Sequence, residues 1–189
     1  HIECGNVHLC LHGLLAYEEL HMTTPFPPFP ISRPRRLRQN PQIRAMVRET
    51  NLHVSDLILP VFVIPGHDQQ EAVPSMPHVQ RHSVDRLVEV ARKAHELGIP
   101  AMALFPNTPA HLRDEKGTEA TNPDNLVCQA SRMIKEHVPD MLVICDVALD
   151  PYTSHGHDGL IENGNIINDA SIDALVSQSL NQVRAGCDI

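Results

Sequence analysis

Apolar residues along the chain form short continuous runs and longer helical stripes. The continuous runs predict strands over 56–66, 101–106 and about 141–147. The first run is rich in β-branched residues, which is typical of a strand buried on both faces. The stripes repeat apolar residues three and four positions apart, which predicts amphipathic helices over about 41–50, 84–97, 124–137 and 171–185. The last five residues, 185–189, are typical of the start of a fourth strand.

Helix-capping residues sharpen several of these boundaries. Ser83 and Ser171 are expected to cap the starts of the helices that follow them, and Gly98 is expected to end the first of these helices. Residues 67–82 are polar and predict a loop.

Strand and helix alternate at a spacing that predicts right-handed βαβ units and a mainly parallel sheet. An α/β fold of this kind is either part of a (β/α)₈ barrel or a small doubly wound sheet. No G-x-G-x-x-G or G-x-x-x-x-G-K-[ST] motif is present, which disfavours a nucleotide-binding open sheet. In a barrel, catalytic residues lie at the carboxyl ends of the strands.

Composition narrows the class of protein further. The chain has 189 residues, of which 42% are hydrophobic, enough for one ordinary domain with a core. A formal charge of −8 disfavours nucleic-acid binding, and no apolar run approaches the length of a membrane span. The five cysteines are scattered and form no C-x-x-C pair, which favours the reducing cytoplasm over an oxidising compartment.

The beginning of the chain is unlike the rest. Residues 1–21 are rich in histidine without a clear period, and Met22 reads as a natural start, so we interpret 1–21 as a non-native or mis-annotated leader. Residues 22–40 are expected to form an extended arm that carries the basic run RPRRLR at 33–38. Such a run either forms a solvated face or docks on another subunit.

The stretch CDVALDPYTSHGHDG, residues 145–159, concentrates the candidate chemistry. Asp146 follows the apolar run MLVIC, so its carboxylate is expected at the mouth of the sheet. The loop after it carries further groups able to bind a metal or transfer a proton, namely Asp150, His155, His157 and Asp158. Carboxylate and imidazole groups suit a borderline or hard cation. Alternatively, the aspartates only form turns and the histidines bind backbone carbonyls.

Several segments together resemble one enzyme family over residues 31–189. They are RPRRLRQNPQIRAMVRETNLHVSDLILPVFV, SMPHVQRHSVDRL, ELGIPAMALFP, NPDNLV and CDVALDPYTSHGHDG with ENGNIINDASIDAL. The family is porphobilinogen synthase, also called 5-aminolevulinate dehydratase, and the aspartate-rich, magnesium-responsive bacterial type is the most similar. The resemblance implies a (β/α)₈ barrel, preceded by an arm, that condenses two 5-aminolevulinate molecules into porphobilinogen for heme biosynthesis. It also implies a homo-octamer formed through the arm, here 31–40.

The resemblance assigns roles within the stretch 145–159. Asp146 matches a catalytic carboxylate of the family, and Ser154 and His157 match neighbours of the substrate. Zinc-dependent relatives have cysteines at the positions of Ala148, Asp150 and Asp158, so a thiolate-bound zinc is disfavoured here. Asp150 and Asp158 are candidate ligands of a weakly bound hard or alkali cation, or direct partners of the substrate.

Other family features fall outside this sequence. The family uses two Schiff-base lysines on later strands, which the resemblance places beyond Ile189, together with its substrate-carboxylate arginines and a ligand of its allosteric Mg²⁺. The lysines that follow the arm, Lys93, Lys116 and Lys135, lie on helices or in a loop and are expected to be solvated. The sequence is therefore interpreted as an inactive N-terminal fragment, truncated near strand 4, with 41–189 as a partial barrel.

Two alternatives to this interpretation stay open. One is a non-catalytic fragment that binds a metal or another subunit, and the other is a metal-dependent, aldolase-like barrel. One local departure from the family is His78, where glycine is common. If that turn requires a positive φ, histidine is more strained there than glycine.

Overall fold

The structure is a computed structural model that describes Ile31 and residues 35–189. The chain divides into two units, one ending at Asn51 and the other covering Leu52–Ile189. The predicted leader over 1–21 and most of the predicted arm over 22–40 lie outside the described residues. Within the described ranges, no helix is long and apolar enough to cross a membrane.

The described part of the first unit contains one short helix, α2 (Pro41–Met46), after the 3₁₀ turn η1 (Arg36–Arg38). The side chain of Asn40 caps α2 by accepting a hydrogen bond of 2.9 Å from the Ile43 amide. The helix was predicted to reach residue 50 but ends at Met46, because none of its residues is buried and no packing extends it. The prediction of an extended run is also wrong for Arg36–Arg38, which form the turn.

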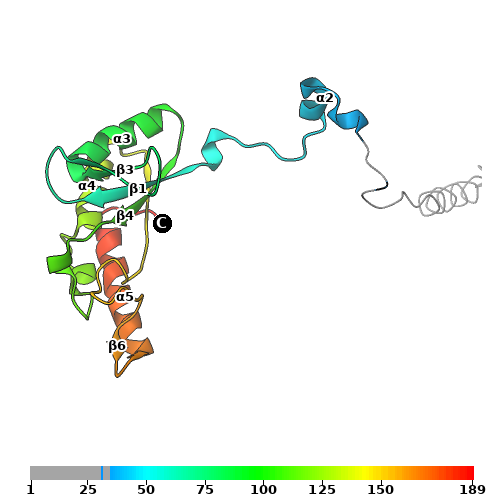
Figure 1. Cartoon of the computed structure of the whole chain (residues 1–189). Helices are drawn as coiled ribbons and strands as arrows, with labels where there is room; N and C mark the ends of the chain where they lie inside the picture. Colours follow the sequence, from blue (N-terminus) through cyan, green and yellow to red (C-terminus); the bar gives the residue numbers. More distant parts are fainter. Residues whose placement is uncertain (1–30, 32–34) are drawn as a thin grey trace, which may run out of the picture. The chain divides into compact units, whose positions relative to one another are not determined.

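The second unit is built on a five-stranded sheet with the order β2-β3-β1-β4-β5 (Figure 1). Four strands are parallel: β3 (Gln80–Ser83), β1 (Ile58–Ile64), β4 (Ala101–Pro106) and β5 (Leu142–Cys145). The edge strand β2 (Gln70–Ala72) pairs antiparallel with β3. The predicted α/β class and mainly parallel sheet are therefore confirmed.

The segment 67–82 is not the loop that the sequence predicted, since β2 and β3 form a hairpin there. Both strands are short and β2 is fully exposed, so no alternation of apolar and polar residues marked them. His78 lies between them at φ 67°, which confirms that this turn requires a positive φ. Glycine adopts this conformation more easily than histidine does.

Helices α3 (Val84–Glu96) and α4 (Leu126–His137) cover one face of the sheet. Leu87 and Ala91 of α3 and Ile134 of α4 are buried in one core together with strand residues such as Val63 and Met102. A third helix, α5 (Asn168–Arg184), follows the small hairpin of β6 (Ile161–Glu162) and β7 (Asn165–Ile166). The predicted alternation of strands and helices is thus confirmed, with boundaries that differ by a few residues.

Two predicted caps have a different role from the one expected. Ser83 precedes α3, but its hydroxyl bonds to the backbone of Gln69 and makes no capping bond. Ser171 lies inside α5, which begins three residues earlier at Asn168. The Ser171 hydroxyl accepts a hydrogen bond from the Leu160 amide and donates one to the Ile167 carbonyl, so it fixes the loop that leads into the helix.

The face of the sheet opposite α3 and α4 is only partly covered. The rings of Phe62 and Phe105 contact each other there with centroids 6.1 Å apart, while Ile58 and Leu142 are 54% and 40% exposed. Side chains alternate between the faces of a strand, and Val143 and Cys145 point into the helix-covered core. Continuing this alternation past the end of β5 places Asp146 on the partly covered face.

Residues 187–189 run beside β5. They do not form the strand that the sequence predicted to begin at 185–189. The amides of Asp188 and Ile189 both donate to the Val143 carbonyl, and the Ile189 carbonyl accepts from the Cys145 amide. Lys135 anchors this segment through an ion pair of 2.8 Å with Asp188, and its side chain is only 26% exposed. The prediction of a solvated lysine is therefore wrong for Lys135, whereas Lys93 and Lys116 are exposed as predicted.

Candidate active site

Three carboxylates gather where β5 ends. Asp146 follows the last strand residue directly, and the loop after it carries Asp150 and Asp158. Asp158 closes this loop on itself, because its Oδ1 accepts a hydrogen bond of 2.6 Å from the Leu149 amide. All three side chains belong to exposed residues at the carboxyl edge of the sheet, where a substrate can reach them.

The electrostatic coupling of the three carboxylates is seen at Asp150. Burial raises the pKa of Asp150 above its ordinary value, and the nearby charges of Asp158 and Asp146 raise this pKa further. Arg113 acts in the opposite direction and lowers the same pKa. Arg113 of the loop after β4 and the three aspartates of the loop after β5 therefore share one electrostatic environment, and Asp150 holds a proton more readily than an ordinary aspartate.

Two glutamines of α5 hold the backbone that carries the carboxylates. Gln182 donates a hydrogen bond of 2.8 Å to the Asp146 carbonyl, and Gln178 donates one of 3.0 Å to the Ala148 carbonyl. Both glutamine side chains are buried, although the sequence pattern of their helix is that of an ordinary amphipathic helix, in which glutamines are expected on the exposed face. Only their four-residue spacing on one helix face could have indicated this role from the sequence.

Ser154 and His157 lie on the same loop as the three carboxylates. The Ser154 amide donates to the Asp114 carbonyl at 2.9 Å, which joins the β5–α5 loop to the β4–α4 loop. His155 reinforces this link, because its Nε2 bonds to the Glu115 carbonyl while its Nδ1 accepts from the His157 amide. Among the described residues, neither Ser154 nor His157 has a side chain hydrogen-bonded to Asp146, Asp150 or Asp158.

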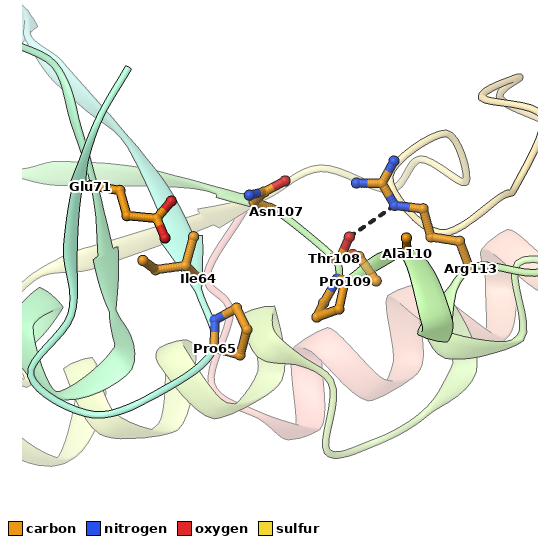
Figure 2. A pocket seen from close by; sticks show the side chains of 8 residues that line it. All are labelled: Ile64, Pro65, Glu71, Asn107, Thr108, Pro109, Ala110 and Arg113. Atoms are coloured by element: carbon orange, nitrogen blue, oxygen red, sulfur yellow. Dashed lines mark hydrogen bonds between the residues drawn. The ribbon is translucent and has the colours of Figure 1, made fainter. Parts of the chain in front are cut away.

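An open pocket of about 460 Å³ lies where β1 and β4 end (Figure 2). It is lined by Ile64 and Pro65 after β1, by Glu71 of β2, and by residues 107–110 and Arg113 after β4. Arg113 is fixed in place because its Nε donates a hydrogen bond of 2.9 Å to the Thr108 carbonyl (Figure 2). Since Arg113 also acts on Asp150, it connects this pocket with the carboxylates at the end of β5.

The described residues offer little for a metal ion. Across Ile31 and 35–189, no group of three or more His, Cys, Asp or Glu side chains is arranged to hold one. Asp150 and Asp158 supply two carboxylates, and one oxygen of Asp158 already accepts the Leu149 amide. This donor set does not fit a strongly bound catalytic metal.

Replacing Asp150 with asparagine is expected to stabilise the fold at neutral pH. A carboxyl with a raised pKa binds more protons in the folded state, so stability falls as pH rises from the ordinary value of 3.8 through the raised one. An asparagine side chain does not titrate, so the variant's gain in free energy of unfolding is full at pH 7 and shrinks toward pH 3.5. Urea unfolding at both pH values checks this, with D173N, an exposed aspartate of α5, as the control. An equal effect of D150N at both pH values would contradict it.

Comparison with known proteins identifies relatives along most of the chain. The family model for delta-aminolevulinic acid dehydratase matches residues 31–189. The delta-aminolevulinic acid dehydratase of Bradyrhizobium diazoefficiens is 56% identical over 157 residues, which cover 83% of this chain and 44% of the relative. The enzyme of the same name from Halalkalibacterium halodurans is 47% identical, over 83% of this chain and 47% of the relative.

A solved structure has the same fold. It is the delta-aminolevulinic acid dehydratase (porphobilinogen synthase) of Toxoplasma gondii in complex with the reaction product porphobilinogen. The similarity has a TM-score of 0.78 at 40% sequence identity, and covers 83% of this chain and 45% of that one. The chain thus spans about half the length of the relatives that it matches.

Proposed function

The chain belongs to the delta-aminolevulinic acid dehydratase family, and from this premise we propose that it carries part of the active site that condenses two 5-aminolevulinate molecules into porphobilinogen, a step of heme biosynthesis. The observation that carries the proposal is the loop DVALDPYTSHGHDG. Its three carboxylates gather at the end of β5, within a match to the family model over residues 31–189.

In this proposal, the carboxylates transfer protons. The condensation joins two substrate molecules and releases water, so protons must leave carbon and nitrogen atoms and reach the departing oxygen. Asp146, on the partly covered face of the sheet, acts as the catalytic carboxylate. Asp150, whose raised pKa favours its protonated form, suits proton donation. Ser154 and His157 contact the substrate from the same loop.

The nucleophilic lysines of the reaction come from the part of the family fold that this chain does not span. Lys93 and Lys116 are exposed. Lys135 donates hydrogen bonds to the Asp188 carboxylate and to the carbonyls of Pro139 and Met141. A lysine that forms a Schiff base must lose its proton near neutral pH, which solvation and an ion pair with a carboxylate both oppose.

The proposal extends to the architecture. The sheet is part of a (β/α)₈ barrel, and the face with Phe62 and Phe105 forms the barrel interior. The partial exposure of this face supports the assignment, because the remaining strands of a barrel would enclose it. On α5, a stripe of apolar side chains is about half exposed or more, as expected of a helix that packs against further elements; it consists of Ile172, Val176, Leu180 and Val183. The arm over 31–40 joins subunits into a homo-octamer.

Metal use and location complete the proposal. An allosteric Mg²⁺ is bound through family ligands outside this chain, and Asp150 with Asp158 binds a hard or alkali cation weakly through carboxylate oxygens. Neither position offers a thiolate for zinc. A cytoplasmic location suits the cysteines of the described residues, Cys128, Cys145 and Cys187, which are all unpaired thiols.

A chimera tests the proposed function. Residues 31–189 replace the matching segment of the Bradyrhizobium diazoefficiens enzyme, which supplies the remainder of the fold. The chimera supplied with 5-aminolevulinate and Mg²⁺ is expected to form porphobilinogen, measured as product per minute per mole of protein. A folded chimera of the parent's oligomeric state that forms no product would refute the function, and would favour a segment that only binds other subunits.

A further inference from the structure

The carboxylate of Asp114 folds a tight turn in the β4–α4 loop. Its Oδ1 accepts hydrogen bonds of 3.0 Å from the amides of Lys116 and Thr118. Hydrogen bonds from the Thr118 hydroxyl and from these amides lower the pKa of Asp114, so the side chain is ionised near neutral pH. An aspartate that accepts amides of the residues just after it holds the backbone in a turn. The geometry of 114–118 therefore depends on this one carboxylate.

The loop that carries the catalytic carboxylates rests on this turn. The Ser154 amide donates to the Asp114 carbonyl at 2.9 Å, and the Asp114 amide donates to the Tyr152 carbonyl at 3.3 Å, as in a parallel β-bridge. The ring of His155 adds a bond of 3.2 Å to the Glu115 carbonyl. Three hydrogen bonds thus hold one side of the loop against two consecutive residues of the turn.

The turn and the loop are also in close packing contact at Gly117. This residue is buried and has a φ of 58°, which glycine adopts without strain. A Cβ atom at this position would lie 3.3 Å from Cγ2 of Thr153 and 3.8 Å from Cβ of Tyr152. The backbone of the turn therefore approaches the loop as closely as it does because residue 117 has no side chain.

Asp146 has a separate support. It follows β5 directly, and Gln182 of α5 holds its carbonyl with a hydrogen bond of 2.8 Å. A change in turn 114–118 should therefore displace Ser154 and His157 while Asp146 keeps its position at the end of the strand. Substrate contacts and the proton-transfer group are fixed by different parts of the fold.

We propose that Asp114 is a positioning residue for substrate binding, because its carboxylate folds the turn that holds Ser154 and His157 in place. The inference rests on the proposed function, which supplies the substrate. A loop that is ordered before binding saves the free energy of ordering it at the moment of binding. Asp114 thus raises the affinity for 5-aminolevulinate without touching the substrate and without a role in the chemical step.

The test is the steady-state kinetics of the chimera. D114A is expected to raise KM about tenfold or more and to leave kcat within about threefold. D114N should have a smaller effect, because its amide oxygen still accepts the two backbone amides but carries no charge. G117A should also raise KM, since its Cβ separates the turn from the loop and leaves Asp114 intact. A merely structural role would lower the amount of active enzyme, and so kcat, at constant KM.

Asp56 provides a matched control. It is an exposed aspartate whose carboxylate accepts a backbone amide, that of His53 at 2.8 Å, in a turn before β1. D56A should leave KM within about twofold. Circular dichroism verifies that each variant is folded, and D114N and G117A serve if D114A is not. An unchanged KM in these variants of the turn would overturn the proposal, as would a loss confined to kcat.

Hydrogen exchange separates this proposal from the proposed function, because it requires no turnover. In the 189-residue chain, D114A is expected to speed exchange of the Ser154 amide about tenfold or more, with no change at the amides of the central strand β4. A chimera that forms no porphobilinogen, together with faster Ser154 exchange in D114A, would refute only the proposed reaction. Equal Ser154 exchange in D114A and wild type would overturn the positioning role of Asp114.

Discussion

Replacing Asp146 with asparagine in the chimera is expected to lower porphobilinogen formation by about 10²-fold or more. Asparagine is almost the same size but neither accepts nor delivers a proton, so the loss reports on chemistry. The fold should tolerate the change, because the Asp146 side chain belongs to an exposed residue and Gln182 binds its backbone carbonyl. Steady-state kinetics should show the loss in kcat, with a much smaller change in KM.

D173N in the same chimera is the control for the Asp146 experiment. Asp173 is an exposed aspartate on α5, so removing its charge alters the net charge equally without touching the loop. Its activity should stay within about twofold of the unmodified chimera. Turnover of D146N within the same range would contradict the catalytic role of Asp146.

Replacing Tyr152 with alanine is expected to cost about 3–5 kcal/mol of the free energy of unfolding. Tyr152 is 2% exposed and forms a second core with Leu149 and Ala120, against which Leu160 and Leu175 pack. This core lies directly under the loop of the carboxylates, so its loss would disorder the site as well. Urea unfolding of the 189-residue chain measures the change.

Tyr152→Phe separates packing from the hydroxyl group. The ring remains in place, so we expect a loss of about 1 kcal/mol or less. Burial raises the pKa of the Tyr152 phenol, so the hydroxyl stays neutral near pH 7 and contributes no charge to the carboxylates. A Y152A variant as stable as Y152F would show that the second core does not support the loop.

Long apolar patterns made much of the fold predictable from sequence. The strand predicted over 101–106 has those bounds in the structure, and each strand or helix that carries a buried stripe lies close to its expected position. The β2–β3 hairpin could not be predicted, because its pairing depends on backbone contacts between exposed polar residues. The true start of α5 was missed because Ser171 bonds to the preceding loop instead of capping the helix.

The candidate site was predictable only where its residues lie close together in the sequence. The aspartates of the loop after β5 were visible as one motif, and their common location at the end of the strand followed from the fold class. Arg113, Gln178 and Gln182 reach this site from other loops and helices, through contacts that span 30 or more residues for the glutamines. Such long-range contacts leave no periodic pattern in the sequence.

Borohydride trapping tests the central claim, that this chain supplies carboxylates and substrate contacts but not the nucleophile. The chimera is incubated with 5-aminolevulinate, any Schiff base is reduced with borohydride, and the modified lysine is located by peptide mass spectrometry. The account predicts adducts only on lysines of the segment from Bradyrhizobium diazoefficiens. The amount of adduct should rise and fall with the rate of porphobilinogen formation across the variants. A substrate adduct on Lys93, Lys116 or Lys135 would contradict it, because the nucleophile would then lie within this chain.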